Sequence, residues 1–454
     1  MLCPHGLPGE GGPVAIPAGP PVAAPAPTLP VGSAPPLSAS GAPLLSVCGA
    51  APSSVTGSPP LVLTGGPVTP LVPSCPLAGT PYVPPLRPSA RTRRPPSLLD
   101  PGTERDPHPV YRTLRGSFPL VYDEPFGAWL ISGYADVRAA LADPRLVAPP
   151  PGPAPDRGEG GAPAAYRALA PPEGEGRVPD ALAAGIERTA HVLARRLASR
   201  READLVAEFC QWLPAAAAVA ALGLPYEDAA RVHAWCRTGL DHVGGRRPGL
   251  DVFLRPHIVR RRARPGGDLL SAFCVATDDG EPLSDEAVTG LAATVLGAAG
   301  DTTARALASF LANLLDHPGQ LDLIRVRPEL TGGAWAESLR RDPPVQIVPR
   351  RALEPIGPIP EGATVACLIG AAGRDPARFA DPDRYDAFRA DPGELAYGSG
   401  RRSCLGAPLA RLTAEHGLRA LLTVFPELRR ADGPRPRAEG LISRSPRTLP
   451  VRLR

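Results

Sequence analysis

The sequence predicts a mainly α-helical protein with a small β-rich subdomain. Apolar residues recur with the 3.6-residue helical period through the middle and the end of the chain. Short apolar runs bounded by turn residues gather instead near residues 119–132 and 345–371, where strands are expected. The composition allows a folded core, because 43% of the 454 residues are hydrophobic and 21% are charged.

The first hundred residues differ in composition from the rest of the chain. About a quarter of them are proline, and Glu10 is the only acidic residue before Asp100. Such a segment has no periodic apolar face to bury, so residues 1–103 are expected to form an extended, disordered arm. An upstream extension that is not truly translated is an equal alternative. The folded domain is expected to span residues 104–454.

Helix start signals and apolar spacing indicate several helices and two strands in the first part of the folded domain. Helices are expected over residues 106–114, 134–143, 179–198, 204–222, 225–243 and 269–277, and strands over 119–122 and 128–132. Residues 148–163 are rich in proline and glycine and are expected to form a loop.

The longest periodic segment begins at Ser284, a residue type suited to cap a helix, with two acidic residues after it. It ends near Asp316, before a Pro-Gly pair, which gives a helix of about 30 residues and about 45 Å. A further helix is expected to end before Pro343, and the last long helix covers residues 407–425.

Charge and cysteine patterns exclude several classes of protein. The net charge is +4, and all 49 basic residues are arginines that are scattered among 45 acidic residues. They do not gather into a basic stripe of the kind that binds nucleic acid. No apolar run approaches the ~18 residues of a membrane helix, and no secretion signal opens the chain. The eight cysteines include no CxxC pair, which argues against disulfides and zinc. A cytoplasmic monomer is expected.

The most informative stretch is AYGSGRRSCLGAPLAR, residues 396–411. Cys404 precedes an expected helix start, where free N–H groups and the helix dipole favour a thiolate. The surrounding glycines allow a flat ligand to approach the backbone. A metal-bound cysteinate fits this setting, with haem iron the natural candidate. The remaining cysteines of the folded domain are expected to be buried small hydrophobes: Cys210, Cys236, Cys274 and Cys367.

This loop resembles the pattern FGxGxHxCxG of the soluble bacterial cytochromes P450. Gly398, Cys404 and Gly406 stand in register, Tyr397 replaces phenylalanine, and Arg402 replaces histidine. The resemblance implies the cytochrome P450 fold with haem b as cofactor and Cys404 as the iron ligand. It also implies that Arg402 binds a haem propionate. Tyr397 and the two glycines would border the cofactor.

The sequence AAGDTT at residues 298–303 lies in the middle of the long helix. Taken alone, its hydroxyls most simply bond to carbonyls four residues earlier. It is similar to the AGxDT segment of the family, in which the helix opens locally beside the iron. The resemblance implies that Thr302 hydrogen-bonds bound oxygen and that Asp301 relays protons. Ala299 stands where the family usually has glycine. The resemblance implies that it borders the cofactor, and its methyl is expected to narrow the oxygen groove.

Glu337 and Arg340 resemble the ExxR pair of the family. An isolated i, i+3 pair is a surface salt bridge worth ~0.5 kcal/mol. The resemblance implies a structural role instead, in which the pair and Arg384 of a PDRY-like segment support the cysteine loop.

Residues 342–353 resemble the family's stretch whose arginine binds a haem propionate. The register indicates Arg350 for this role, with Arg351 as the competitor. Three nearby apolar residues are expected on the substrate side or in the core: Val345, Ile347 and Val348. The resemblance is weakest between residues 148 and 188. Gly174 stands where the family has a propionate-binding histidine, and Arg177 is a candidate substitute.

The resemblance implies a monooxygenase that inserts one atom of O2 into a small organic substrate. Electrons would come from NAD(P)H through a ferredoxin reductase and a ferredoxin, which Arg401 could contact. The arginine-rich composition suggests a high-GC bacterium and a role in secondary metabolism. Two alternatives stay open: a haem-binding relative without turnover that acts as a partner or sensor, and a helical protein without haem.

Overall fold

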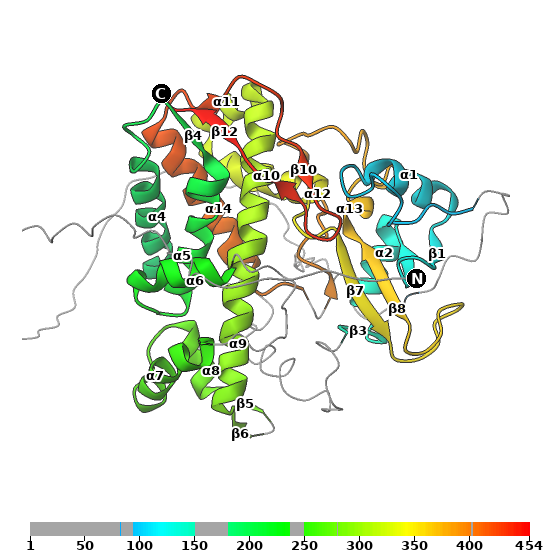
Figure 1. The fold of residues 1–454 in the computed structure, drawn as a ribbon, viewed down its shortest axis with the longest axis horizontal. Coiled ribbons are helices and arrows are strands. Elements are labelled where there is room, and N and C mark those ends of the chain that lie inside the picture. The colour runs from blue at the N-terminus through cyan, green and yellow to red at the C-terminus, as the bar shows by residue number, and fades with distance from the viewer. Residues whose placement is uncertain (1–81, 83–93, 150–179, 237–248, 279, 401–402) are drawn as a thin grey trace, which may run out of the picture. The chain divides into compact units, whose positions relative to one another are not determined.

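The computed structural model describes a largely helical protein with small β-sheets (Figure 1). The residues described are 82, 94–149, 180–236, 249–278, 280–400 and 403–454. All of them belong to one compact unit that begins at Val72. Within these residues, no helix combines the length and the apolar character needed to cross a membrane.

Helices alternate with π and 3₁₀ turns along most of the described chain. The α-helices are α1 His108–Ser117, α2 Tyr134–Ala142, α4 Asp180–Arg195, α5 Trp212–Ala221, α6 Ala229–Cys236, α7 Leu250–Ala263, α8 Leu269–Val275, α9 Asp285–Gly297, α10 Thr303–Asp316, α11 Pro318–Val326, α12 Thr331–Arg341, α13 Ile369–Ala372 and α14 Ala407–Val424. The π turns are η1 Val206–Cys210 and η4 Ala298–Thr302, and the 3₁₀ turns are η2 Tyr226–Asp228 and η5 Pro328–Leu330.

The largest sheet has five strands in the order β1-β2-β8-β7-β3. Its strands are β1 Leu120–Asp123, β2 Ala128–Ile131, β3 Leu146–Val147, β7 Ile347–Ala352 and β8 Thr364–Leu368. Only β2 and β8 pair in parallel; the other neighbours are antiparallel. Smaller sheets contain β4 Glu202–Asp204 with β12 Pro450–Arg452 and β9 Arg429–Arg430, β10 Ala438–Glu439 with β11 Ser445–Pro446, and β5 Thr277–Asp278 with β6 Glu281–Pro282.

These elements confirm the predicted fold class, and most predicted helices lie within a few residues of their expected bounds. The helix α7 was missed by the prediction. It carries Pro256 in its interior, a residue type that normally ends a helix, and a run of arginines that hides its apolar period. Leu254 and Ile258 are nevertheless buried, so packing against α8 and α9 stabilises the helix despite the proline.

The long central helix forms as predicted, from its cap at Ser284 to Asp316. The Ser284 hydroxyl accepts the Ala287 N–H at 3.2 Å. The helix is not uniform, because the π turn η4 lies between α9 and α10, the two segments labelled in Figure 1. A π turn widens the backbone locally, which is the opening that the resemblance implied for this segment.

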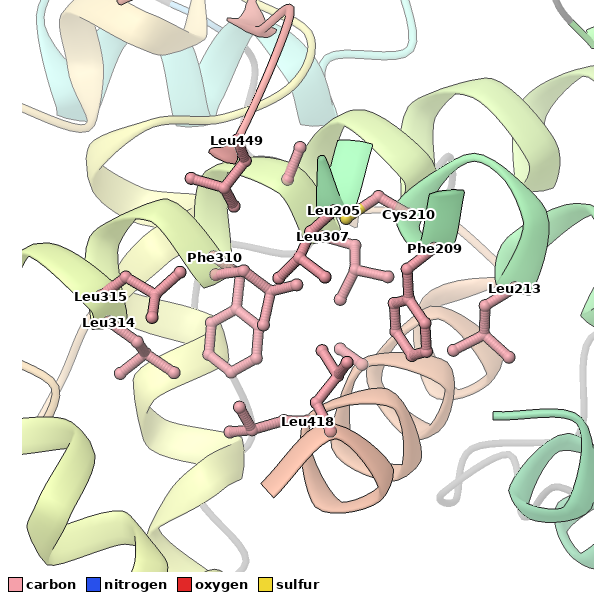
Figure 2. Packing of buried hydrophobic residues seen from close by; sticks show 14 of the residues in the cluster. Leu205, Phe209, Cys210, Leu213, Leu307, Phe310, Leu314, Leu315, Leu418 and Leu449 are labelled. Carbon is pink, nitrogen blue, oxygen red and sulfur yellow. The ribbon is translucent and has the colours of Figure 1, made fainter. Parts of the chain in front are cut away.

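The main apolar core lies between α10, the segment around η1 and α14. Leu307 and Phe310 from α10 face Phe209 and Leu213, and Leu418 of α14 lies beside them (Figure 2). All five are at most 2% exposed. Full burial of such side chains contributes roughly 1.5–3 kcal/mol each, so this core fixes the second half of the central helix.

Two apolar residues that precede the expected domain boundary at residue 104 are buried in the folded unit. Leu98 is 1% exposed and Tyr82 is 2% exposed. The folded part therefore includes residues before the predicted boundary. The other residues between 1 and 93 lie outside the described part, so their disorder stays a prediction.

The Glu337–Arg340 pair is a buried ion pair and not a surface salt bridge, because both side chains are fully buried. Arg340 donates to Glu337 at 2.6 and 2.7 Å. The prediction that Arg384 completes this cluster was wrong: the third side chain is Arg389, whose Nε donates to Glu337 at 3.1 Å. Arg384 contributes only its carbonyl oxygen, which accepts from Arg340.

Replacing Glu337 with alanine is expected to lower the free energy of unfolding by about 3–5 kcal/mol, because it leaves Arg340 buried and unpaired. Denaturant unfolding measures this change. The matched control is Glu439→Ala, which breaks the exposed pair with Arg447 and is expected to cost under ~1 kcal/mol. Equal losses in the two variants would contradict the assignment of Glu337 as the buried centre of the cluster.

Candidate haem site

Cys404 lies two residues before Gly406, the residue that caps the start of α14. Its N–H donates to the carbonyl of Tyr397 at 2.7 Å, which closes the loop. Burial of the thiol raises its pKa, while N–H groups of Gly406 and Ala407 that bond to the sulfur work in the opposite direction. Burial outweighs these bonds, so the pKa of the Cys404 thiol lies above its ordinary value, and a bound metal ion would be needed to deprotonate it.

Cys404 as a whole residue also differs in exposure from the other cysteines whose side chains the structure describes, although its thiol is partly shielded from water. Cys404 is exposed, whereas Cys210, Cys274 and Cys367 are buried. Burial raises the pKa of the Cys367 thiol to about 12, so it stays protonated and unreactive. The buried, structural role expected for these three is confirmed; the side chain of Cys236 lies outside the described part.

The loop is fixed from α12 through Tyr397. The indole Nε1 of Trp335 donates to the Tyr397 hydroxyl at 2.9 Å. Trp335 lies two residues before Glu337 and is 2% exposed. Sequence reasoning missed it, because a tryptophan on the apolar face of a helix gives no signal beyond burial. The cluster around Glu337 therefore reaches the cysteine loop through a specific hydrogen bond.

Glycines serve different purposes in this loop. Gly398 and Gly400 have φ values of +80° and +71°, which favour glycine. A Cβ on Gly400 would lie 2.9 Å from the Cβ and 3.0 Å from the Cα of Ala142, at the end of α2. Gly406 has an ordinary φ of −81°, and a Cβ there would lie 3.6 Å from the Cys404 sulfur. The loop backbone thus approaches α2 more closely than any other residue type allows.

Strand register separates the two arginines that competed for the propionate role. Arg350 pairs with Val365 in β8 and is 8% exposed, whereas Arg351 faces solvent. The Arg350 charge opposes the rise in the Cys367 pKa that burial causes, so the guanidinium lies near that buried thiol. Ile347 belongs to the core, as its alternative assignment predicted, and Val345 and Val348 are half-buried.

The polar residues of η4 are bonded within the helix. The Thr302 hydroxyl donates to the Ala298 carbonyl, the arrangement expected of a threonine without a special role. Asp301 accepts from Arg305 Nε at 2.9 Å. Arg305 was missed by the prediction, although its i+4 spacing from an acid is a visible signal. Ala299 is half-buried, and its neighbour Ala298 is exposed in mid-helix.

The donor set around Cys404 suits a metal that brings most of its own ligands. Among the described residues no three His, Cys, Asp or Glu side chains are placed to hold a metal ion together. A porphyrin supplies four ligands of iron and needs only one sulfur from the protein. Leu405 beside the sulfur is 43% exposed, which leaves apolar surface for a flat ring. These residues fit haem.

Several predicted contacts lie outside the described residues. They are Arg401, Arg402, Gly174 and Arg177. The described part therefore brings together Cys404, Tyr397 and the loop glycines, and places Arg350 on the large sheet.

Comparison with known proteins identifies the family. The chain is 34% identical over 345 residues to cytochrome P450 107B1 of Saccharopolyspora erythraea, across 68% of this chain and 84% of the relative. The chain belongs to the cytochrome P450 family. The family's own sequence profile, Cytochrome P450, matches residues 329–449. Membership makes this P450 a haem-dependent oxidoreductase of the monooxygenase type.

Further similarities agree with this family. The monooxygenase PikC of Streptomyces venezuelae is 32% identical over 359 residues, across 71% of this P450 and 85% of PikC. The crystal structure of P450BioI, in complex with an acyl carrier protein ligated to hexadec-9Z-enoic acid, superposes with a TM-score of 0.68 at 26% identity. It covers 78% of this P450 and 99% of that chain.

Gly400→Ala is expected to destabilise this P450 more than Gly102→Ala. Both residues have positive φ, which alone costs about 1 kcal/mol for alanine. Only Gly400 also meets a backbone atom, since a Cβ on Gly102 has open space around it. Thermal unfolding of both variants measures the difference. Equal shifts in the midpoint would show that the loop is not packed tightly against α2.

Proposed function

We propose that this P450 inserts one oxygen atom of O2 into a small organic substrate in secondary metabolism. The second oxygen atom leaves as water, with two electrons and two protons supplied from outside the substrate. Cys404, an exposed residue just before a helix start in a member of this family, is the observation that carries the proposal. Two relatives support the substrate class: PikC and the mycinamicin IV hydroxylase/epoxidase of Micromonospora griseorubida, 32% identical over 363 residues.

Haem b would be held by this chain's own side chains. Cys404 supplies the thiolate ligand, and Arg350 supplies a buried cation for one propionate. We assign the other propionate to Arg402. Tyr397, Gly398, Gly406 and Ala299 would border the ring. When bound, the haem supplies the site at which O2 binds and is activated.

Thr302 and Asp301 would control protons near the bound oxygen. The Thr302 hydroxyl already donates to Ala298, so its lone pairs remain available to accept from a water or an O–H group. Accepting in this way would hold a proton donor at Thr302 Oγ1. Asp301 would carry protons inward from water after exchanging its bond with Arg305. Directed delivery matters because cleavage of O2 needs protons at one oxygen only.

Electrons would come from NAD(P)H through a ferredoxin reductase and a ferredoxin in the cytoplasm. A cavity of about 390 Å³ adjoins the cysteine loop at Gly398 and Ser399. Its charged lining residues are Arg138, Arg378, Asp391 and Glu394. The two acidic residues balance these two arginines, so the proposed contact for an acidic electron carrier is Arg401 in the cysteine loop.

Cys404→Ser is expected to abolish the red-shifted band of the reduced, carbon monoxide-treated protein, because a hydroxyl cannot replace the thiolate. Absorbance spectroscopy of the haem-loaded full chain measures this. The matched control is Cys274→Ala, which alters a buried cysteine and is expected to keep the band. A wild-type protein without haem absorbance would overturn the proposed function, and so would an intact band in Cys404→Ser.

Thr302→Ala is expected to uncouple O2 consumption from product formation by a factor of about 10² or more, since a positioned proton-transfer group is lost. Thr294→Ala is the control, because Thr294 makes the same bond to a carbonyl four residues earlier, at Gly290. Product and O2 are measured with ferredoxin, reductase and a substrate panel. Unchanged coupling in Thr302→Ala would refute its role, and a wild-type protein without product would favour the alternative of a haem-binding relative without turnover.

A further inference from the structure

Tyr82 is buried in the core of the large sheet although it precedes α1 by more than twenty residues. Its side chain is 2% exposed and packs in one cluster with Val137 and Leu141 of α2, Leu146 of β3 and Cys367 of β8. The sequence around it, Pro-Tyr-Val-Pro-Pro, restricts the unfolded chain and lowers the entropy lost on docking. A single ring from the proline-rich part of the chain thus belongs to the folded unit.

The backbone of Tyr82 is held as firmly as its ring. Its N–H donates to Asp143 Oδ2 at 2.6 Å, and its carbonyl accepts from Arg145 Nη2 at 2.9 Å. Arg145 also donates to both carboxylate oxygens of Asp143, whose side chain is fully buried. Burial alone would raise the pKa of Asp143, but the bonds from Arg145 and Tyr82 outweigh it and lower the pKa. The Tyr82 N–H therefore satisfies a buried charge directly after α2.

The same end of α2 touches the cysteine loop. Asp143 directly follows Ala142, and the Cα of Gly400 packs so tightly on Ala142 that no Cβ fits between them. A second contact runs through the core, since Leu395 belongs to the same cluster as Tyr82. The carbonyl of Leu395 accepts the Gly398 N–H at 2.9 Å, which forms the first turn of the loop.

We propose that Tyr82 is a positioning residue for the cysteine loop. By filling the core beneath α2 and bonding to Asp143, it fixes the end of α2 against which Gly400 rests, and so limits the movement of Cys404. The proposal depends on the proposed function only in naming this loop as the haem-binding loop. Under this proposal Tyr82, a residue of the proline-rich segment, helps to set the position of the cysteine loop.

The hydroxyl of Tyr82 supplies a matched control. It is buried and has no hydrogen-bond partner among the described residues. Tyr82→Phe removes only this unpaired group and keeps the ring and both backbone bonds, so it should be neutral or stabilising. Tyr82→Ala keeps the backbone bonds but leaves a cavity beneath α2.

The test is hydrogen exchange of backbone amides in the haem-free full chain, with three proteins: wild type, Tyr82→Ala and Tyr82→Phe. The amides of Ser403 and Cys404 report on the loop, since they bond to Gly400 and Tyr397. In Tyr82→Ala these amides and those of α2 are expected to exchange about tenfold faster, while amides in the core of α10 stay unchanged. Tyr82→Phe is expected to match the wild type.

Three outcomes would overturn the proposal. Faster exchange in α2 without a change at Ser403 and Cys404 would limit Tyr82 to anchoring α2. Uniform acceleration that includes α10 would show a general loss of stability, and a Tyr82→Phe protein that behaves like Tyr82→Ala would show that ring burial is not the cause. A second readout is the rate of haem loss, expected to rise about tenfold in Tyr82→Ala only. A wild type that binds no haem would refute the proposed function while the exchange experiment still decides the role of Tyr82.

Discussion

The buried carboxylate of Glu337 is the constraint on which the rest of the site depends. A charge without access to water is stable only when every lone pair meets a donor. Arg340, Arg389 and the Asp386 N–H supply those donors, so the helix α12 and the segment after the large sheet are fixed together. Trp335 projects from the same helix to the Tyr397 hydroxyl, which extends this rigidity into the cysteine loop.

The cysteine loop is held from two sides, although Cys404 is itself an exposed residue. Trp335 fixes Tyr397 from α12, and Ala142 supports Gly400 from α2. The Cys404 N–H closes the loop on the Tyr397 carbonyl between these two supports. A ligand atom held by its backbone needs little rearrangement when a cofactor binds, which is the physical meaning of a preorganised site. The loop can therefore be rigid while Cys404 is exposed, because the contacts that fix the loop are made by Tyr397, Gly400 and the Cys404 N–H.

The backbone of the central helix differs between its packed part, α10, and its polar part, the π turn η4. The turns of α10 are almost wholly buried, whereas η4 leaves Ala298, Asp301 and Thr302 at least partly accessible. π turns are frequent at functional sites because they widen the helix without ending it. Asp301 and Thr302 bond within the helix in the ligand-free protein, so the polar groups cost little where they stand.

The sequence by itself determined the local features: most of the helices, the cap of the central helix, and Cys404 at a helix start. These follow from periodicity, capping and glycine chemistry, which act over a few residues. The opening in the central helix was implied by the resemblance to the family. Only the tertiary structure decided that Arg389 completes the buried cluster, that Arg350 and not Arg351 points inward, and that Trp335 and Tyr82 support the site. Such contacts join segments far apart in the chain, and packing, which no local pattern encodes, selects among side chains of equal chemistry.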